Sequence, residues 1–149
     1  MFCSILNRRE KKKTNWTFSL PTEAEFEYAS RAGLSLRQSI QKSNDPKFGN
    51  CRQSNLGKTT KVGNYPANNY GFFDLFGNVW EMCSDRLSSY TSSTAINPKG
   101  PNRANGQLVL RGGSFCNWGA HGQSSWKAST SEEYKHACIG FRVAFKQAD

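Results

Sequence analysis

The sequence carries one strong helix signal, and the chain around it is rich in residues that favour turns. Pro21 precedes Thr22, and Glu25 follows that threonine by three residues. This is the pattern of a capping box, in which the Thr22 hydroxyl and the Glu25 carboxylate accept hydrogen bonds from each other's backbone amides. Gly33 supplies a natural C-terminal stop. The pattern predicts a helix over about residues 22–32.

Two convincing strand signals lie in the last third of the chain. Residues 107–111 form a run of apolar and β-branched character that ends at Gly112, and residues 139–145 alternate so that one face is apolar. Between the helix and these strands, residues 35–69 predict a long loop with one short strand near 61–65. The fold class predicted is therefore α+β and loop-rich, with short antiparallel strands and one clear helix.

Aromatic residues are plentiful although hydrophobic residues as a whole are scarce, at 13% and 36% of the chain. Large rings supply core area, so we expect one folded domain rather than a disordered chain. No apolar run reaches the length of a membrane span. The basic residues follow the short apolar start instead of preceding it, which is the wrong order for a secretory signal. We therefore expect a cytoplasmic, bacterial protein without membrane contact.

The formal net charge of +9 raises the question of nucleic-acid binding, but the charge distribution argues against it. A dense basic block occupies residues 8–13, and the remaining Lys and Arg are scattered among loops. A charge run at a terminus is usually a solvated tail, with weak binding to anionic surfaces as the alternative. The sequence predicts a basic tail and no nucleic-acid role.

The five cysteines are widely spaced and contain no Cys-X-X-Cys pair, which argues against a zinc ribbon or a thioredoxin-type site. They are Cys3, Cys51, Cys83, Cys116 and Cys138. A Cys116–Cys138 disulfide would require an oxidising compartment, and the sequence does not indicate one.

Four stretches, in this order and with this spacing, resemble the formylglycine-generating enzyme (sulfatase-modifying factor) family. They are residues 20–28 (LPTEAEFEY), 70–81 (YGFFDLFGNVWE), 108–115 (LVLRGGSF) and 139–144 (IGFRVA). The resemblance implies a C-type-lectin-like fold over residues 18–145, between a basic tail at 1–17 and a short tail at 146–149. It also implies that much of the family's N-terminal portion is missing. A partner chain or an oligomer could cover the apolar surface left exposed, and a truncated gene product is the alternative.

Catalytic members of this family use two cysteines and copper to convert a cysteine of a client sulfatase to formylglycine. Cys116 follows the Arg-Gly-Gly-Ser motif and falls near the first cysteine position, but no cysteine lies between 117 and 137. His121 is the one nearby residue that could join Cys116 as a copper ligand. The alternative is a surface thiol and a solvated loop histidine, and this reading favours a protein without the enzymatic activity.

The resemblance implies a calcium site as well. Its ligands would be Asp74, Gly77, Val79 and Glu81, two through side-chain oxygens and two through backbone carbonyls. Oxygen ligands suit a hard cation. The alternative is that Asp74 and Glu81 only cap and solvate a turn.

The loop at 115–138 is the expected working surface. It is polar and contains three aromatic residues suited to anchoring a protein or small-molecule ligand: Trp118, Trp126 and Tyr134. The sequence therefore predicts a noncatalytic binding or scaffold domain. The alternatives are the copper-dependent oxidase, a ligand-binding protein diversified by a retroelement, and a truncated gene product.

Overall fold

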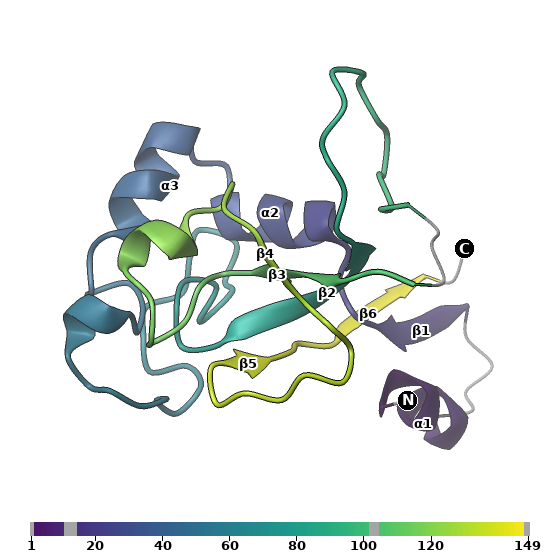
Figure 1. Cartoon of the computed structure of the whole chain (residues 1–149), viewed down its shortest axis with the longest axis horizontal. Helices are drawn as coiled ribbons and strands as arrows, with labels where there is room; N and C mark the ends of the chain where they lie inside the picture. Colours follow the sequence, from purple (N-terminus) through teal and green to yellow (C-terminus); the bar gives the residue numbers. More distant parts are fainter. Residues whose placement is uncertain (1, 11–14, 102–104, 148–149) are drawn as a thin grey trace.

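The computed structural model describes residues 2–10, 15–101 and 105–147 and has an α+β fold, as the sequence predicts (Figure 1). The larger sheet has the strand order β4-β3-β2-β5, and a second sheet pairs β1 with β6. The strands are β1 (Trp16–Ser19), β2 (Trp80–Arg86), β3 (Leu108–Arg111), β4 (Ala128–Thr130), β5 (Ile139–Gly140) and β6 (Ala144–Gln147). All neighbouring strands are antiparallel except β2 and β5, which run parallel.

Helix α2 (Glu23–Arg31) confirms the predicted helix and its capping box. Thr22 Oγ1 accepts a hydrogen bond from the Glu25 amide at 3.1 Å, and the Glu25 carboxylate accepts one from the Thr22 amide at 2.8 Å. The chain leaves the helix through Ala32, which is left-handed at φ +46°, and then through Gly33 at φ +79°. The stop therefore uses two left-handed residues, of which only the glycine could be recognised in the sequence.

Helix α3 (Leu36–Ser43) lies where the sequence predicts only a loop. A second capping box, Ser35 with Gln38, starts it. Its buried positions are serines, and Ser39 Oγ donates to Ser124 Oγ at 2.9 Å. Because the buried side of α3 is made of serines, the sequence shows no apolar stripe there, and only the capping box could have indicated the helix. The strand expected near residues 61–65 is not found, and those residues lie in turns and irregular chain.

The C-terminal run predicted as one strand is two short strands in different sheets. β5 extends the larger sheet beside β2, and β6 pairs with β1. Arg142 lies between them and reaches the Glu81 carboxylate. The two parts of the run pair with different neighbours, so the alternating apolar pattern does not form one continuous strand.

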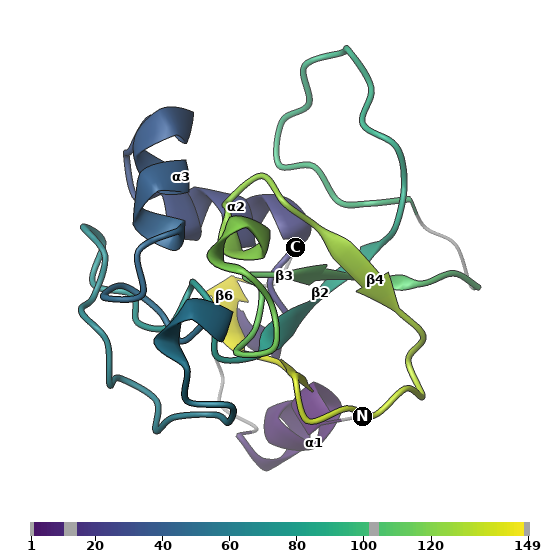
Figure 2. The same cartoon turned by 60° about the vertical axis from the view of Figure 1, so that its left-hand side comes forward.

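The first 17 residues, expected to be a solvated tail, contain helix α1 (Phe2–Arg9) and the start of β1. β6 likewise extends to Gln147 in the expected C-terminal tail. Figure 2 shows α1 at the bottom of the view, apart from the larger sheet.

The core lies between α2 and the larger sheet, where Phe26, Leu75, Cys83 and Val109 pack together. In the part of the chain that the structure describes, no helix is long and apolar enough to cross a bilayer. The core brings the end of β3, and with it Arg111, against α2.

Candidate functional site

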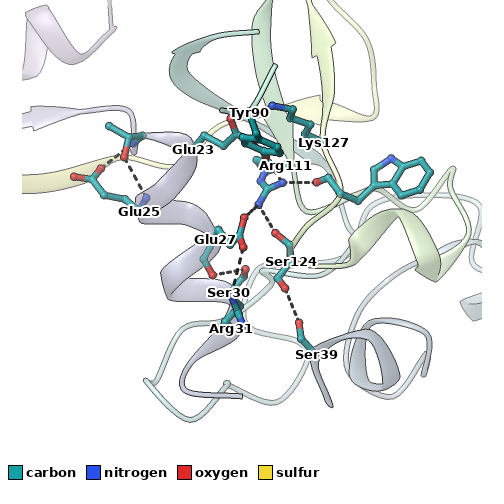
Figure 3. Close-up of polar contacts among 12 residues, drawn as sticks. Glu23, Glu25, Glu27, Ser30, Arg31, Ser39, Tyr90, Arg111, Ser124 and Lys127 are labelled. Atoms are coloured by element: carbon teal, nitrogen blue, oxygen red, sulfur yellow. Dashed lines mark hydrogen bonds and ion pairs between the residues drawn. The ribbon is translucent and has the colours of Figure 1, made fainter. Parts of the chain in front are cut away.

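Arg111 joins the predicted working loop to helix α2, as Figure 3 shows. Its side chain is fully buried. Nη1 donates to the Trp126 carbonyl at 2.8 Å, and Nη2 donates to Glu27 Oε2 at 2.7 Å and to the Ser124 carbonyl. A planar guanidinium suits such a fork of acceptors, so Arg111 fixes the backbone at Trp126.

Trp118, His121 and Trp126 lie together on the surface of this loop. Trp118 and Trp126 are 52% and 46% exposed. The His121 ring meets that of Trp126 edge-on, with centroids 5.0 Å apart, and its Nδ1 lies 3.2 Å from the Trp118 carbonyl. The Arg52 guanidinium lies 5.0 Å from the Trp118 ring centroid. We call Arg52, Trp118, His121 and Trp126 the tryptophan surface.

Tyr134, the third predicted anchor, contacts a different partner. It is half exposed and stacks on His136, with ring centroids 6.0 Å apart. The sequence did not indicate Arg52, which is 66 residues from Trp118 and comes from a 3₁₀ helix at Arg52–Ser54. No local pattern signals a cation–π pair at that separation.

Hydrogen bonds hold the beginning of the loop in place. The Trp80 indole N–H and the Ser114 hydroxyl both donate to Asn117 Oδ1, at 2.8 and 2.6 Å. The Arg52 amide donates to the Asn117 carbonyl at 2.8 Å. Gly113 is left-handed at φ +73°, and a Cβ there would lie 2.9 Å from the Gly122 nitrogen. The tryptophan surface is therefore preorganised by a tight turn and buried polar bonds.

A disulfide between Cys116 and Cys138 closes the loop. Cys116 is exposed and Cys138 is buried. Nothing in the sequence indicates an oxidising compartment, so this bond was not predicted. Since the Cys116 sulfur is bonded to another sulfur, it is not available as a thiolate, and Cys116 with His121 does not fit a copper ion. No cluster of three or more His, Cys, Asp or Glu side chains suited to a metal occurs among the described residues.

The predicted calcium loop is tightly folded. Gly77 is left-handed at φ +76°, and a Cβ there would lie 2.1 Å from the Asn50 carbonyl oxygen. Asp74 Oδ2 accepts a hydrogen bond from the Gly63 amide at 2.6 Å, whereas Asp74 Oδ1 is buried without a hydrogen-bond partner. An unpaired buried carboxylate oxygen is the kind of ligand that calcium prefers.

Glu81, at the other end of this loop, is engaged by Arg142. Arg142 Nη2 and Nε lie 2.6 and 2.5 Å from the two carboxylate oxygens. Burial raises the pKa of Glu81, and the contacts with Arg142 act in the opposite direction. Arg142 Nη2 also donates to the carbonyls of Phe73 and Asp74. The residues fit calcium at Asp74, while at Glu81 an ion and Arg142 would compete for one carboxylate.

A groove of about 730 Å³ lies between α2 and residues 88–101. Tyr28, Tyr70 and Tyr90 are among its lining residues. The Tyr90 hydroxyl donates to Glu23 Oε1 at 2.5 Å, and Lys127 Nζ lies 3.6 Å from the Tyr90 ring centroid (Figure 3). Burial and Glu23 raise the pKa of Tyr90. The sequence indicated only turns here, although its serines and tyrosine are typical of recognition loops.

Comparison with known proteins gives a consistent result. The family model for the sulfatase-modifying factor enzyme 1-like domain matches residues 1–147. The formylglycine-generating enzyme of Streptomyces coelicolor is 32% identical, over 84% of this chain and 46% of that protein. The serine/threonine-protein kinase pkn1 of Chlamydia caviae is 40% identical, over 64% of this chain and 16% of that protein. This chain thus spans less than half the length of either relative.

Among solved structures, PvdO from Pseudomonas aeruginosa superposes with a TM-score of 0.80 at 21% identity. The superposition covers 98% of this chain and 57% of that one. At this identity the likeness concerns the fold alone.

Proposed function

Because this chain belongs to the sulfatase-modifying factor family and has its C-type-lectin-like fold, we propose that it is a noncatalytic binding domain. The tryptophan surface is its ligand-binding face. The observation that carries this proposal is a pair of half-exposed tryptophans on a loop closed by a disulfide and fixed by buried Arg111. Rigid aromatic side chains of this kind supply most of the binding energy at protein interfaces. This chain is also similar to part of a protein named as a kinase, and this similarity supports a noncatalytic role for domains of the family.

A copper-dependent oxidase is the less favoured function. Copper would supply oxygen chemistry at a pair of soft ligands, but the disulfide holds the Cys116 sulfur. His121 is occupied in packing on Trp126 and lies near the Trp118 carbonyl. These contacts support a place for His121 in the tryptophan surface rather than at a metal.

A displayed library of random peptides tests the binding proposal. Selection against the wild-type domain should return peptides whose affinity falls at least about tenfold with Trp118→Ala or Trp126→Ala, which is the size of effect expected of interface anchors. Phe72→Ala is the matched control, because the Phe72 ring is similarly exposed, at 44%, but lies outside the tryptophan surface. The proposal is wrong if the selection returns no binders, or if none of the binders depends on Trp118 or Trp126.

Oxygen consumption with copper and a Cys-X-Pro-X-Arg peptide tests the absence of catalysis. We expect no turnover above the rate of free copper, because the disulfide with Cys138 occupies the Cys116 sulfur and leaves no thiolate there to bind copper. Turnover that disappears with Cys116→Ser would establish the enzyme instead.

We further propose that calcium braces the loop at residues 74–81. Asp74 and the backbone carbonyls of Gly77 and Val79 would hold the ion, and Glu81 would join them by exchanging its contacts with Arg142 for the ion. The unpaired Asp74 Oδ1 is the observation that favours it. This brace would stabilise the domain without taking part in ligand binding.

The location of the protein stays a prediction. Disulfides are rare in the cytosol of mesophiles and persist in oxidising compartments. Cys116–Cys138 therefore weighs against the cytoplasmic location expected from the sequence, and thiol titration of protein isolated from each cell fraction would decide the question.

A further inference from the structure

The outer edge of strand β1 is closed by a single side chain. Within the described chain β1 pairs only with β6, with Phe18 opposite Phe145. The Phe18 amide donates to Asn7 Oδ1 at 2.7 Å, and Asn7 Nδ2 donates to the Phe18 carbonyl at 2.8 Å. The carboxamide of Asn7 thus satisfies the two backbone groups that a neighbouring strand would use.

The alternation of strand geometry places the backbone groups of Trp16 on the same outer edge, because residues two apart face the same way. An unpaired strand edge is a template for pairing with another chain. A two-stranded ribbon is also marginal by itself and gains from a third strand. The edge of β1 therefore has the geometry of a docking site that α1 covers.

Helix α1 is weakly attached. None of its residues is buried, and Phe2 is 53% exposed although its ring lies 5.3 Å from that of Phe141. A helix of eight residues has little stability of its own and depends on packing, which is slight here. Local opening of such elements costs much less than global unfolding. Asn7 can leave Phe18 without disturbing the core.

The charge around this edge selects the kind of partner. Elements α1, β1 and β6 contain Arg8, Arg9 and Lys146 and no acidic residue. Glu10 directly follows α1, and Glu25 of α2 pairs with Lys146, so the formal charge of these five groups together is still positive, at three minus two. The rings of Trp16 and Phe145, which stack at 5.4 Å between centroids, are both half exposed beside the edge. A second copy of this chain would bring the same positive charges together, whereas an acidic segment would be attracted.

We propose that the outer edge of β1 is a strand-docking site for an extended acidic segment of another polypeptide, and that Asn7 on α1 occupies this edge when the partner is absent. The segment pairs with Trp16 and Phe18 by backbone hydrogen bonds. Its apolar side chains lie on the rings of Trp16 and Phe145, and its carboxylates approach the basic residues. This binding mode is strand addition to a sheet edge. The proposal is independent of ligand binding at the tryptophan surface.

The test uses a fluorescent peptide of alternating Glu and Val, with fluorescence anisotropy measured on the full chain. The wild-type protein should bind it, and binding should weaken as salt rises. Asn7→Ala should tighten binding at least threefold, because the competing carboxamide is gone. Asn44→Ala is the matched control, since Asn44 Nδ2 donates to the Ile40 carbonyl of α3, and it should have no effect.

Two further probes distinguish strand pairing from charge attraction. A peptide N-methylated at alternate residues cannot pair along one edge and should bind at least tenfold more weakly. Trp16→Pro removes an outward amide, which edge strands tolerate, and it should have a similar effect, while circular dichroism confirms folding. The proposal is overturned if the N-methylated peptide or a Lys-Val peptide binds as tightly as the Glu-Val peptide. It is also overturned if none of these peptides binds. A dimer in analytical ultracentrifugation that Trp16→Pro abolishes would overturn the choice of an acidic partner.

Discussion

At the scale of single residues, Arg111 is the most important structural residue of the candidate site. It is fully buried, and its guanidinium contacts α2 on one side and two loop carbonyls on the other. Removing or altering one member of such a buried set leaves the remaining partners unsatisfied, which costs more than the bond itself contributes. Arg111 therefore helps to hold the Trp126 backbone in place.

Replacing Arg111 by lysine should lower the free energy of unfolding by about 2 kcal/mol, because lysine keeps the charge but cannot serve the fork of acceptors. Urea titration measures the change. Arg86→Lys is the control: Arg86 pairs with Glu132, whose side chain is 58% exposed, and its loss should cost less than about 1 kcal/mol. Equal effects of the two substitutions would contradict the role given to Arg111.

At the scale of elements, the start of α2 combines a cap with an ion pair. Glu25 accepts a hydrogen bond from the Thr22 amide and lies 3.0 Å from Lys146 Nζ of β6. Burial raises the pKa of Glu25, but the bonds from Thr22 and Lys146 outweigh it, and the net pKa lies below 4.5. The same carboxylate therefore starts a helix and ties it to the smaller sheet.

The pH dependence of stability follows from the sign of this shift. A carboxyl group whose pKa is lower in the folded state adds stability above its unfolded pKa and loses it as the pH falls through the folded value. Wild-type protein should therefore be more stable than Glu25→Gln at pH 6, and the difference should vanish as the pH falls below the lowered pKa. Glutamine keeps the capping acceptor, so only the charge is removed. Chemical denaturation at several pH values measures the unfolding free energy of both proteins. A difference between them that does not change with pH would refute this account.

At the scale of the whole molecule, two small sheets and long ordered loops surround a modest core. The loop containing Asp74 and Glu81 precedes and enters β2, and Arg142 connects Glu81 to the segment between β5 and β6. An ion bound only by the folded protein stabilises it by mass action. The calcium proposal therefore predicts a change in global stability.

Saturating calcium should raise the thermal midpoint by about 5–10 °C over protein treated with chelator, as expected for a ligand at about a hundredfold excess over its dissociation constant. Asp74→Ala should abolish this difference. Asp45→Ala is the control, because Asp45 Oδ1 accepts a bond from the exposed Lys47 amide outside this loop. Scanning calorimetry gives the midpoints, and identical values with calcium and with chelator would count against the ion.

The sequence by itself determined the elements whose causes are local. The capping box of Thr22 and Glu25 specified α2, the apolar run specified β3, and four motifs specified the family and fold. Trp118 and Trp126 were predicted as ligand anchors from their place in a polar loop, and both side chains are half exposed; their role as anchors stays a prediction. Such features depend on residues a few positions apart, which a single sequence displays directly.

Only the tertiary structure decided the features that join distant segments. Cys116 pairs with Cys138, Arg52 lies against Trp118, and Asn7 closes the edge at Phe18. The C-terminal run divides into β5 and β6 because one part pairs with β2 and the other with β1, which is distant in the sequence. These contacts depend on how the core brings distant segments together. Such long-range packing produces no repeating residue pattern from which it could be predicted.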